Sequence, residues 1–123
     1  MNYTVTPPPT GFLHAPVIEH IYGLYVVFHK YLRSYPKCEY YSLGKIIQDN
    51  LLQTMEITLY CASTKPQLKK EKLQLACAKL DLIKILVRLS FDVKAINYKQ
   101  YVNLQEKLQT IGKMIGGWVK SIN

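Results

Sequence analysis

The sequence has 123 residues, a formal net charge of +8, and 49% hydrophobic and 20% charged residues, a composition typical of a folded globular domain and not of a disordered chain. A chain of this length buries roughly two thirds of its unfolded surface, so one domain is expected. The longest apolar-looking stretch, residues 17–28, contains Glu19 and His20 and is shorter than the about 20 apolar residues of a membrane span. We therefore expect no membrane partner.

The cysteines and the first residues indicate a compartment. The sequence has three cysteines, Cys38, Cys61 and Cys77, and no Cys-x-x-Cys motif. An odd number of cysteines without this motif is not typical of a disulfide-bonded fold. Residues 1–10 carry no cation and hold three consecutive prolines, so they lack the pattern of a secretory leader. These features predict a reduced, cytoplasmic chain whose cysteines act as small buried hydrophobic residues.

The positive charge is concentrated in the second half of the sequence. Residues 1–67 hold five lysines and arginines against four acids, whereas residues 68–123 hold eleven against four. This asymmetry predicts an anionic partner, with nucleic acid as the first choice and an acidic protein surface or a lipid as the alternatives.

In chain order, a proline-containing arm over residues 1–15 precedes a helical domain over residues 16–123. Pro16 suits the first turn of a helix, and Pro36 should end that helix. Between them the apolar residues recur every three or four positions, as on one face of a helix. These are Ile18, Ile21, Tyr25, Phe28, Leu32 and Tyr35.

The second and third helices show more apolar surface than one neighbour can cover. The second is expected from about Tyr40 to Ala62, and the third from the Pro66 turn to Asp92 or Val93. The second has apolar residues nearly all round, and its main stripe mixes Leu43, Ile46, Ile47, Leu51 and Ile57 with Asn50, Thr54 and Thr58. The third has one stripe at Leu73, Ala76, Leu80, Ile83 and Val87 and a second at Leu75, Leu82, Leu86, Leu89 and Val93.

The fourth helix starts from a capping box. Asn97 can cap it, and Gln100 stands three residues later, where a side chain can return the bond. Gly112 and Gly116 lie at one edge of its apolar stripe and weaken the helix, so we expect a close contact with a neighbouring helix to compensate. The stripe is Tyr101, Leu104, Leu108, Ile111, Ile115, Trp118 and Ile122.

Four such helices joined by short loops predict an all-α fold, an up-down-up-down antiparallel four-helix bundle. The surplus apolar surface on the second and third helices predicts homo-oligomerisation.

No catalytic or metal-binding pattern is found. The histidines fall within the first 29 residues without an H-E-x-x-H pair, and the acids are scattered with no close pair on one helix face. His29 is expected to be a packed histidine. We therefore expect no enzyme activity, no catalytic residue, no metal and no cofactor.

The sequence offers better candidates for a binding surface than for a catalytic site. Lys70, Lys84 and Arg88 project from one face of the third helix, although ion pairs from Asp81 to Lys84 and from Arg88 to Asp92 would make this an ordinary solvated face. On the fourth helix, Lys113 and Lys120 are one heptad apart, and no acid follows Glu106 to neutralise them. Two basic rows on consecutive antiparallel helices would form a positive surface that binds polyphosphate. Most of the tyrosines are expected in the core or in an interface. Only Tyr40, Tyr41 and Tyr98 are left as candidates to stack on the bases of a single strand.

The sequence ends with the run Gly112-Lys113-Met114-Ile115-Gly116-Gly117-Trp118, followed by Val119, Lys120 and Asn123. This run resembles the C-terminal helix of the accessory variability determinants (Avd) of diversity-generating retroelements. Lys84 and Arg88 fall at basic positions of that family, and the resemblance covers about residues 16–123. The same superfamily includes four-helix-bundle proteins encoded in intervening sequences of bacterial 23S ribosomal RNA genes.

The resemblance implies a homopentameric barrel of four-helix bundles that binds RNA or DNA and the reverse transcriptase, without a catalytic role of its own. Lys84, Arg88 and Lys113 would contact RNA or the polymerase, and Gly112, Gly116 and Trp118 would be packing residues. Lys120 and Lys70 are added from their positions on the helix faces. The alternative is an oligomeric scaffold of the intervening-sequence type whose basic face binds an acidic protein.

Overall fold

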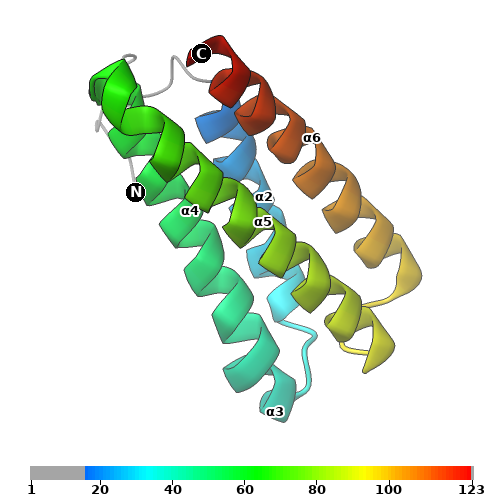
Figure 1. Ribbon diagram of the computed structural model, residues 1–123. Coiled ribbons are helices and arrows are strands. Elements are labelled where there is room, and N and C mark those ends of the chain that lie inside the picture. The colour runs from blue at the N-terminus through cyan, green and yellow to red at the C-terminus, as the bar shows by residue number, and fades with distance from the viewer. Residues whose placement is uncertain (1–15, 123) are drawn as a thin grey trace, which may run out of the picture.

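The computed structural model describes residues 16–122, which form four long helices and contain no strand (Figure 1). The expected all-α fold, a four-helix bundle, is confirmed. The arm expected over residues 1–15 lies outside the described residues. The four helices are α2 (Pro16–Leu32), α4 (Lys45–Ser63), α5 (Lys69–Asp92) and α6 (Tyr98–Ile122).

Short helical turns precede two of these helices. The three-residue helix α3 (Lys37–Glu39) and a π-helical turn (Tyr40–Gly44) run directly into α4, and a 3₁₀ turn (Pro66–Leu68) runs into α5. The second helical segment therefore begins at Lys37, three residues before the expected start at Tyr40, because the chain becomes helical immediately after Pro36.

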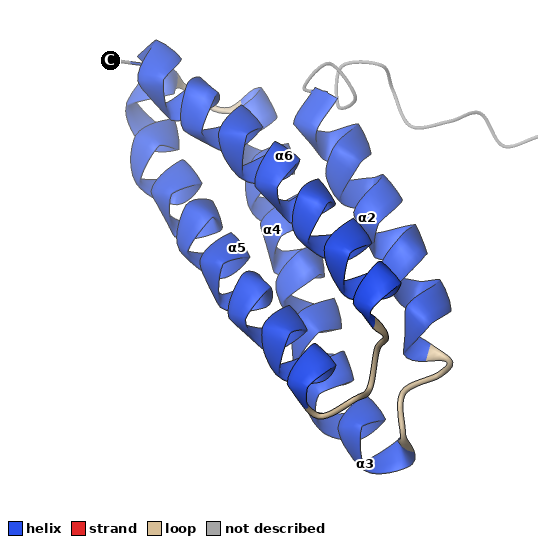
Figure 2. Ribbon diagram, turned by 90° about the vertical axis from the view of Figure 1, so that its right-hand side faces the viewer, coloured by secondary structure: helices blue, strands red, loops and turns tan. Residues whose placement is uncertain are grey.

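Each long helix packs against two others. α5 contacts α4 on one flank and α6 on the other, while α2 contacts both α4 and α6 and so completes the bundle. In Figure 2, α6 lies between α5 and α2. The largest fully buried side chains come from all four helices and include Phe28, Leu51, Ile83 and Ile111. One apolar core therefore runs along the bundle.

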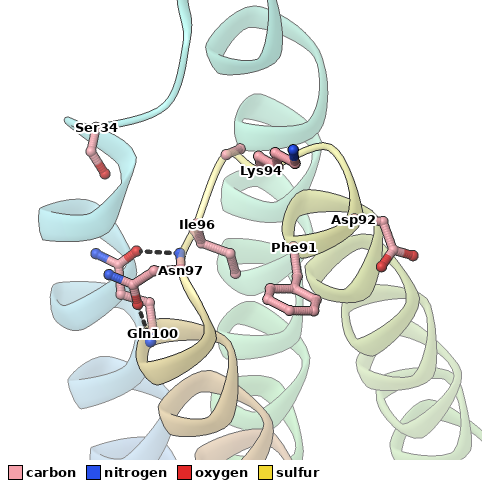
Figure 3. A pocket seen from close by; sticks show the side chains of 8 residues that line it. Ser34, Phe91, Asp92, Lys94, Ile96, Asn97 and Gln100 are labelled. Atoms are coloured by element: carbon pink, nitrogen blue, oxygen red, sulfur yellow. Dashed lines mark hydrogen bonds between the residues drawn. The ribbon is translucent and has the colours of Figure 1, made fainter.

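The main stripes of α5 and α6 are confirmed as core. All five residues of the first α5 stripe are buried, and so are the four central residues of the α6 stripe. At the ends of α6, Tyr101, Trp118 and Ile122 are partly buried against the core. The expected capping box is also present, because Gln100 N donates to Asn97 Oδ1 at 2.8 Å and Asn97 N donates to Gln100 Oε1 at 3.0 Å (Figure 3).

The first helix is shorter than expected. α2 ends at Leu32, and the next three amides donate to carbonyls three residues back instead of four. Pro36 disfavours the helical conformation for the residue before it, so the chain leaves the helix early. Tyr35 is nevertheless buried, as its place in the stripe predicted.

The stripe predicted for α4 is partly wrong. Ile46 is exposed, but Asn50, Thr54 and Thr58 are buried, as their place on the predicted stripe requires. Each of these polar side chains donates a hydrogen bond to a backbone carbonyl of its own helix, at 2.8 Å from Asn50 and Thr54 and 2.9 Å from Thr58. The polar residues can occupy the core because their hydrogen bonds are made within the helix.

Two single-residue expectations are also wrong. His29 is exposed and not packed, because it lies beside the buried stripe of α2 and not on it. Cys38 is exposed near the start of the second helical segment, whereas Cys61 is buried and Cys77 is partly buried as expected. Burial raises the pKa of the Cys61 thiol, which agrees with its role as a small hydrophobic residue.

The helices were also compared with the requirements of a bilayer. Within residues 16–122, every helix is too short or too polar to span a membrane.

Candidate nucleic-acid interface

A pocket of about 320 Å³ lies between α5 and α6. It brings together Lys84 of α5 and Lys113 of α6, two of the basic residues singled out in the sequence. We call the surface between these two helices the basic groove. The pocket is lined by Cys77, Leu80, Asp81, Lys84, Gln109, Gly112 and Lys113.

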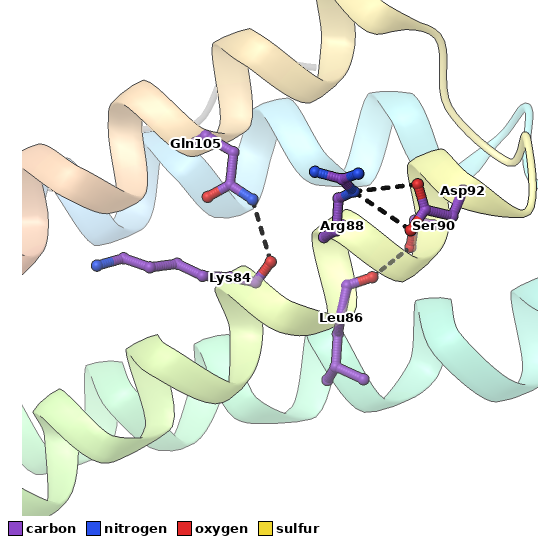
Figure 4. Close-up of polar contacts among 6 residues, drawn as sticks. All are labelled: Lys84, Leu86, Arg88, Ser90, Asp92 and Gln105. Carbon is purple, nitrogen blue, oxygen red and sulfur yellow. Dashed lines mark hydrogen bonds and ion pairs between the residues drawn. The ribbon is translucent and has the colours of Figure 1, made fainter.

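Lys84 is held in this groove by both helices. Its backbone carbonyl accepts a hydrogen bond of 3.0 Å from Gln105 Nε2 of α6 (Figure 4). Its ammonium lies 3.8 Å from Asp81 Oδ1, so the predicted ion pair is confirmed. Asp81 is largely exposed, and a long pair of this kind contributes at most about 1 kcal/mol. Lys84 can therefore exchange this carboxylate for a stronger anion.

Arg88 lies one turn further along the same face of α5. Its Nε donates to Asp92 Oδ1 at 3.0 Å and to Oδ2 at 3.2 Å, which confirms the second predicted pair (Figure 4). These bonds and the neighbouring Tyr101 raise the pKa of Arg88 above its ordinary value. The guanidinium is therefore a permanent positive charge at this position.

The glycines of α6 do not make the close helix contact that was expected. A Cβ on Gly112 would meet only Lys84 Nζ, at 3.7 Å, and a Cβ on Gly116 would meet nothing within 4 Å in the described part of the chain. The neighbouring Ile111 and Ile115 supply the buried contacts. We call Gly112 and Gly116 the glycine edge. Gly112 lines the pocket of the basic groove, where it leaves space beside Lys84 that a side chain would fill.

The remaining predicted site residues lie outside the pocket. Lys120 is exposed in the last turn of α6, and Lys70 is exposed in the first turn of α5. Within residues 16–122 no carboxylate forms an ion pair with Lys113 or Lys120. These two lysines contribute positive charge that the described residues do not neutralise.

Sequence reasoning missed two features of the groove ends. Lys69 Nζ lies 5.7 Å from the centre of the Trp118 ring, a cation–π contact that joins the start of α5 to the end of α6. At the other end, Phe91 of α5 packs against Tyr98 and Tyr101 of α6. Both pairings connect residues far apart in the sequence, so helical periodicity alone carried no signal for them.

The titratable side chains bear on metal binding and on the reactivity of the thiol in the pocket. Among residues 16–122, no group of three or more histidine, cysteine or acidic side chains is arranged to hold a metal ion. Burial and then Asp81 raise the pKa of the Cys77 thiol in the pocket, which disfavours the nucleophilic thiolate. The arrangement is suited to binding an anion.

Comparison with known proteins agrees with this assignment of the fold. No curated protein and no solved structure matches the chain. A family model described as bAvd-like matches residues 17–122, nearly the whole described region. The protein therefore belongs to the bAvd-like family, the family of the accessory variability determinants.

Proposed function

We propose that this protein is a non-catalytic accessory subunit of a diversity-generating retroelement. It binds template RNA or its cDNA, together with the reverse transcriptase, and supports mutagenic cDNA synthesis. The observation that carries this proposal is the pairing of Lys84 and Lys113 in one groove of a bAvd-like chain.

The groove has the electrostatic properties that a polyphosphate requires. Arg88 continues the positive row beyond Lys84, while Lys70 and Lys120 extend it on the first turn of α5 and the last turn of α6. Cations in a row displace the counterions of a phosphate backbone, which gives salt-dependent binding with little sequence preference. We assign the reverse transcriptase to the same surface, because polymerase and template must meet.

The other flank of α5 supports self-assembly. Lys79 Nζ donates to Gln53 Oε1 of α4 at 2.6 Å, so this flank faces α4. Leu75 and Leu82 lie one turn on either side of Lys79. The second stripe of α5 is exposed at Leu75 (46%), Leu82 (41%), Leu89 (43%) and Val93 (45%). We call these four residues the apolar flank.

An apolar row of this length is unusual on a monomer and typical of a protein interface. The buried member of the predicted stripe, Leu86, joins it to the core. We infer that copies of the bundle associate through the apolar flank into a homopentameric barrel.

We also propose that successive helices alternate in direction, as in an up-down-up-down bundle. The short loops at opposite ends of the bundle in Figure 1 support this topology. The arm at residues 1–15 is proposed to be separate from this domain.

The ion pairs on α5 favour a second candidate. Asp81 and Asp92 offset part of the charge of Lys84 and Arg88. A surface whose net positive charge is reduced in this way would bind an acidic protein in preference to nucleic acid. The second candidate is accordingly an oligomeric scaffold that binds such a protein.

Charge reversal separates the two candidates. We expect the triple variant Lys84→Glu, Arg88→Glu, Lys113→Glu to bind RNA at least about 10-fold more weakly, and to lose about two to three units of its salt slope, because each phosphate contact contributes about one. Filter binding over a series of salt concentrations measures both quantities.

The matched control carries the same change of charge elsewhere. Lys30, Arg33 and Lys37 are exposed around the end of α2, and their reversal to glutamate should leave the salt slope at its original value. Equal losses in both variants would indicate a response to total charge only. Unchanged RNA binding and salt slope in the groove variant would contradict the first candidate. No retention of RNA by the original protein at low salt would favour the acidic-protein scaffold.

A further inference from the structure

Three aromatic rings meet where α5 ends and α6 begins. The ring centres of Phe91 and Tyr101 lie 4.9 Å apart with 28° between their planes, a stacked arrangement. Tyr98 lies 6.0 Å from Phe91 and 6.3 Å from Tyr101, measured between ring centres. Although its ring belongs to this cluster, Tyr98 is 67% exposed. The cluster therefore presents aromatic surface to solvent, and we call these three residues the aromatic corner.

Positive side chains flank the aromatic corner. Arg88 lies one turn before Phe91 on α5, and Tyr101 is one of the groups that raise its pKa. On the other side, Lys94 of the α5–α6 loop and Phe91 both line a pocket of about 710 Å³ (Figure 3). Asp92 is the acid in that pocket, and Arg88 already pairs with it. The corner thus combines flat apolar rings with cations, and it continues the basic groove at Arg88.

The backbone conformation of Lys94 is an independent observation. Its φ is 66°, and no other non-glycine residue in the range 16–122 has a positive φ. It occupies the turn that ends α5, where Ala95 N donates to Ser90 O at 2.8 Å and Lys94 N donates to Phe91 O at 3.0 Å. Glycine is the residue usually found at such a position, because a side chain strains the left-handed conformation. The chain therefore carries a cation here at a cost to its own stability.

We propose that the aromatic corner stacks unpaired bases of a single-stranded nucleic acid whose phosphates lie over Arg88 and Lys94. This inference rests on the proposed function and narrows its ligand to single strands. Aromatic faces stack on any base, which suits binding without sequence preference, whereas a duplex hides its base faces. A duplex would reach only the cations of the groove, so it would gain nothing from Tyr98.

The test compares one labelled single-stranded RNA with the duplex formed from it, by fluorescence anisotropy on the full-length protein. Tyr98→Ala should weaken single-strand binding by about 5-fold to 100-fold and leave duplex binding and the salt slope unchanged, because it removes stacking and no charge. Tyr98→Phe should retain single-strand binding. The matched control is Tyr22→Ala, since Tyr22 is 64% exposed on α2, away from the groove.

Lys94→Gly separates binding from folding. It should raise the melting temperature, because glycine adopts the left-handed conformation without strain, and yet lower the single-strand salt slope by about one. A residue with only a structural role would produce the first change and not the second. An unchanged salt slope would remove Lys94 from the proposed site.

The outcomes distinguish the two proposals. If the original protein binds RNA and Tyr98→Ala binds single strands equally well, the stacking site is wrong and the proposed function stands. Equal weakening of single strands and duplex would also overturn the stacking site. If Tyr98→Ala keeps its RNA binding but no longer retains the reverse transcriptase in a pull-down, the corner docks a protein and the stacking site is wrong. No RNA binding by the original protein would overturn both proposals.

Discussion

Helix α5 has one flank that faces α6 and another that faces α4. The first flank is basic, whereas the second is apolar. Toward α6, Lys84 and Arg88 border a groove that the glycine edge of α6 leaves open. Toward α4, Leu82 and Leu89 remain exposed beside the Lys79–Gln53 hydrogen bond. The buried stripe of α5 lies between the two flanks. The contrast supports the proposal of two separate binding surfaces, one for phosphate and one for another copy of the chain.

The largest effect is expected on the apolar flank. Leu82→Glu with Leu89→Glu should reduce the oligomer to single chains, because each buried leucine contributes about 1.5 to 3 kcal/mol and each glutamate would have to be desolvated. Light scattering at micromolar concentration measures the mass.

A control variant places the same charges outside this flank. Gln67→Glu with Gln74→Glu changes one exposed residue in the 3₁₀ turn before α5 and one near the start of α5, and it should keep the assembly intact. An original protein that is already monomeric would contradict the assignment of the apolar flank.

A substitution in the glycine edge should have a smaller effect, and it should stabilise the protein. Gly116→Ala should stabilise the protein by about 0.5 to 1 kcal/mol and raise its melting temperature by a few degrees. Alanine favours the helix, and within residues 16–122 no atom of another segment lies within 4 Å of the added Cβ. Thermal unfolding measures the change. Destabilisation or loss of the oligomer would mean that another copy packs against Gly116, and the contrast between the two flanks would then fail.

Much of this fold could be predicted from the sequence, since the features involved are local. The capping box at Asn97 and Gln100 and the ion pair from Arg88 to Asp92 depend on spacing within one helix. The main stripes of α5 and α6 follow from helical periodicity in the same way. Basic residues from α5 and α6 could be expected on one surface, because consecutive helices in a bundle are neighbours.

The errors arose where hydrogen bonding or a distant contact decided the outcome. Ile46 reads as part of the buried stripe of α4, yet it is exposed. The polar Thr54 of the same stripe is buried, because its hydroxyl bonds to the Asn50 carbonyl. Gly116 reads as a packing residue, but whether a neighbour approaches depends on how α5 and α6 sit against each other. The aromatic corner joins Phe91 to Tyr101 across a loop, and periodicity within one helix cannot anticipate that contact.

The most direct test of the two-surface account measures the groove variant for both properties. Lys84→Glu, Arg88→Glu, Lys113→Glu should keep the oligomeric mass of the original protein by light scattering while losing its binding to RNA. The reversed residues are at least partly exposed and lie away from the apolar flank, so assembly should not depend on them. An oligomer that dissociates, or RNA binding that persists unchanged, would contradict the account.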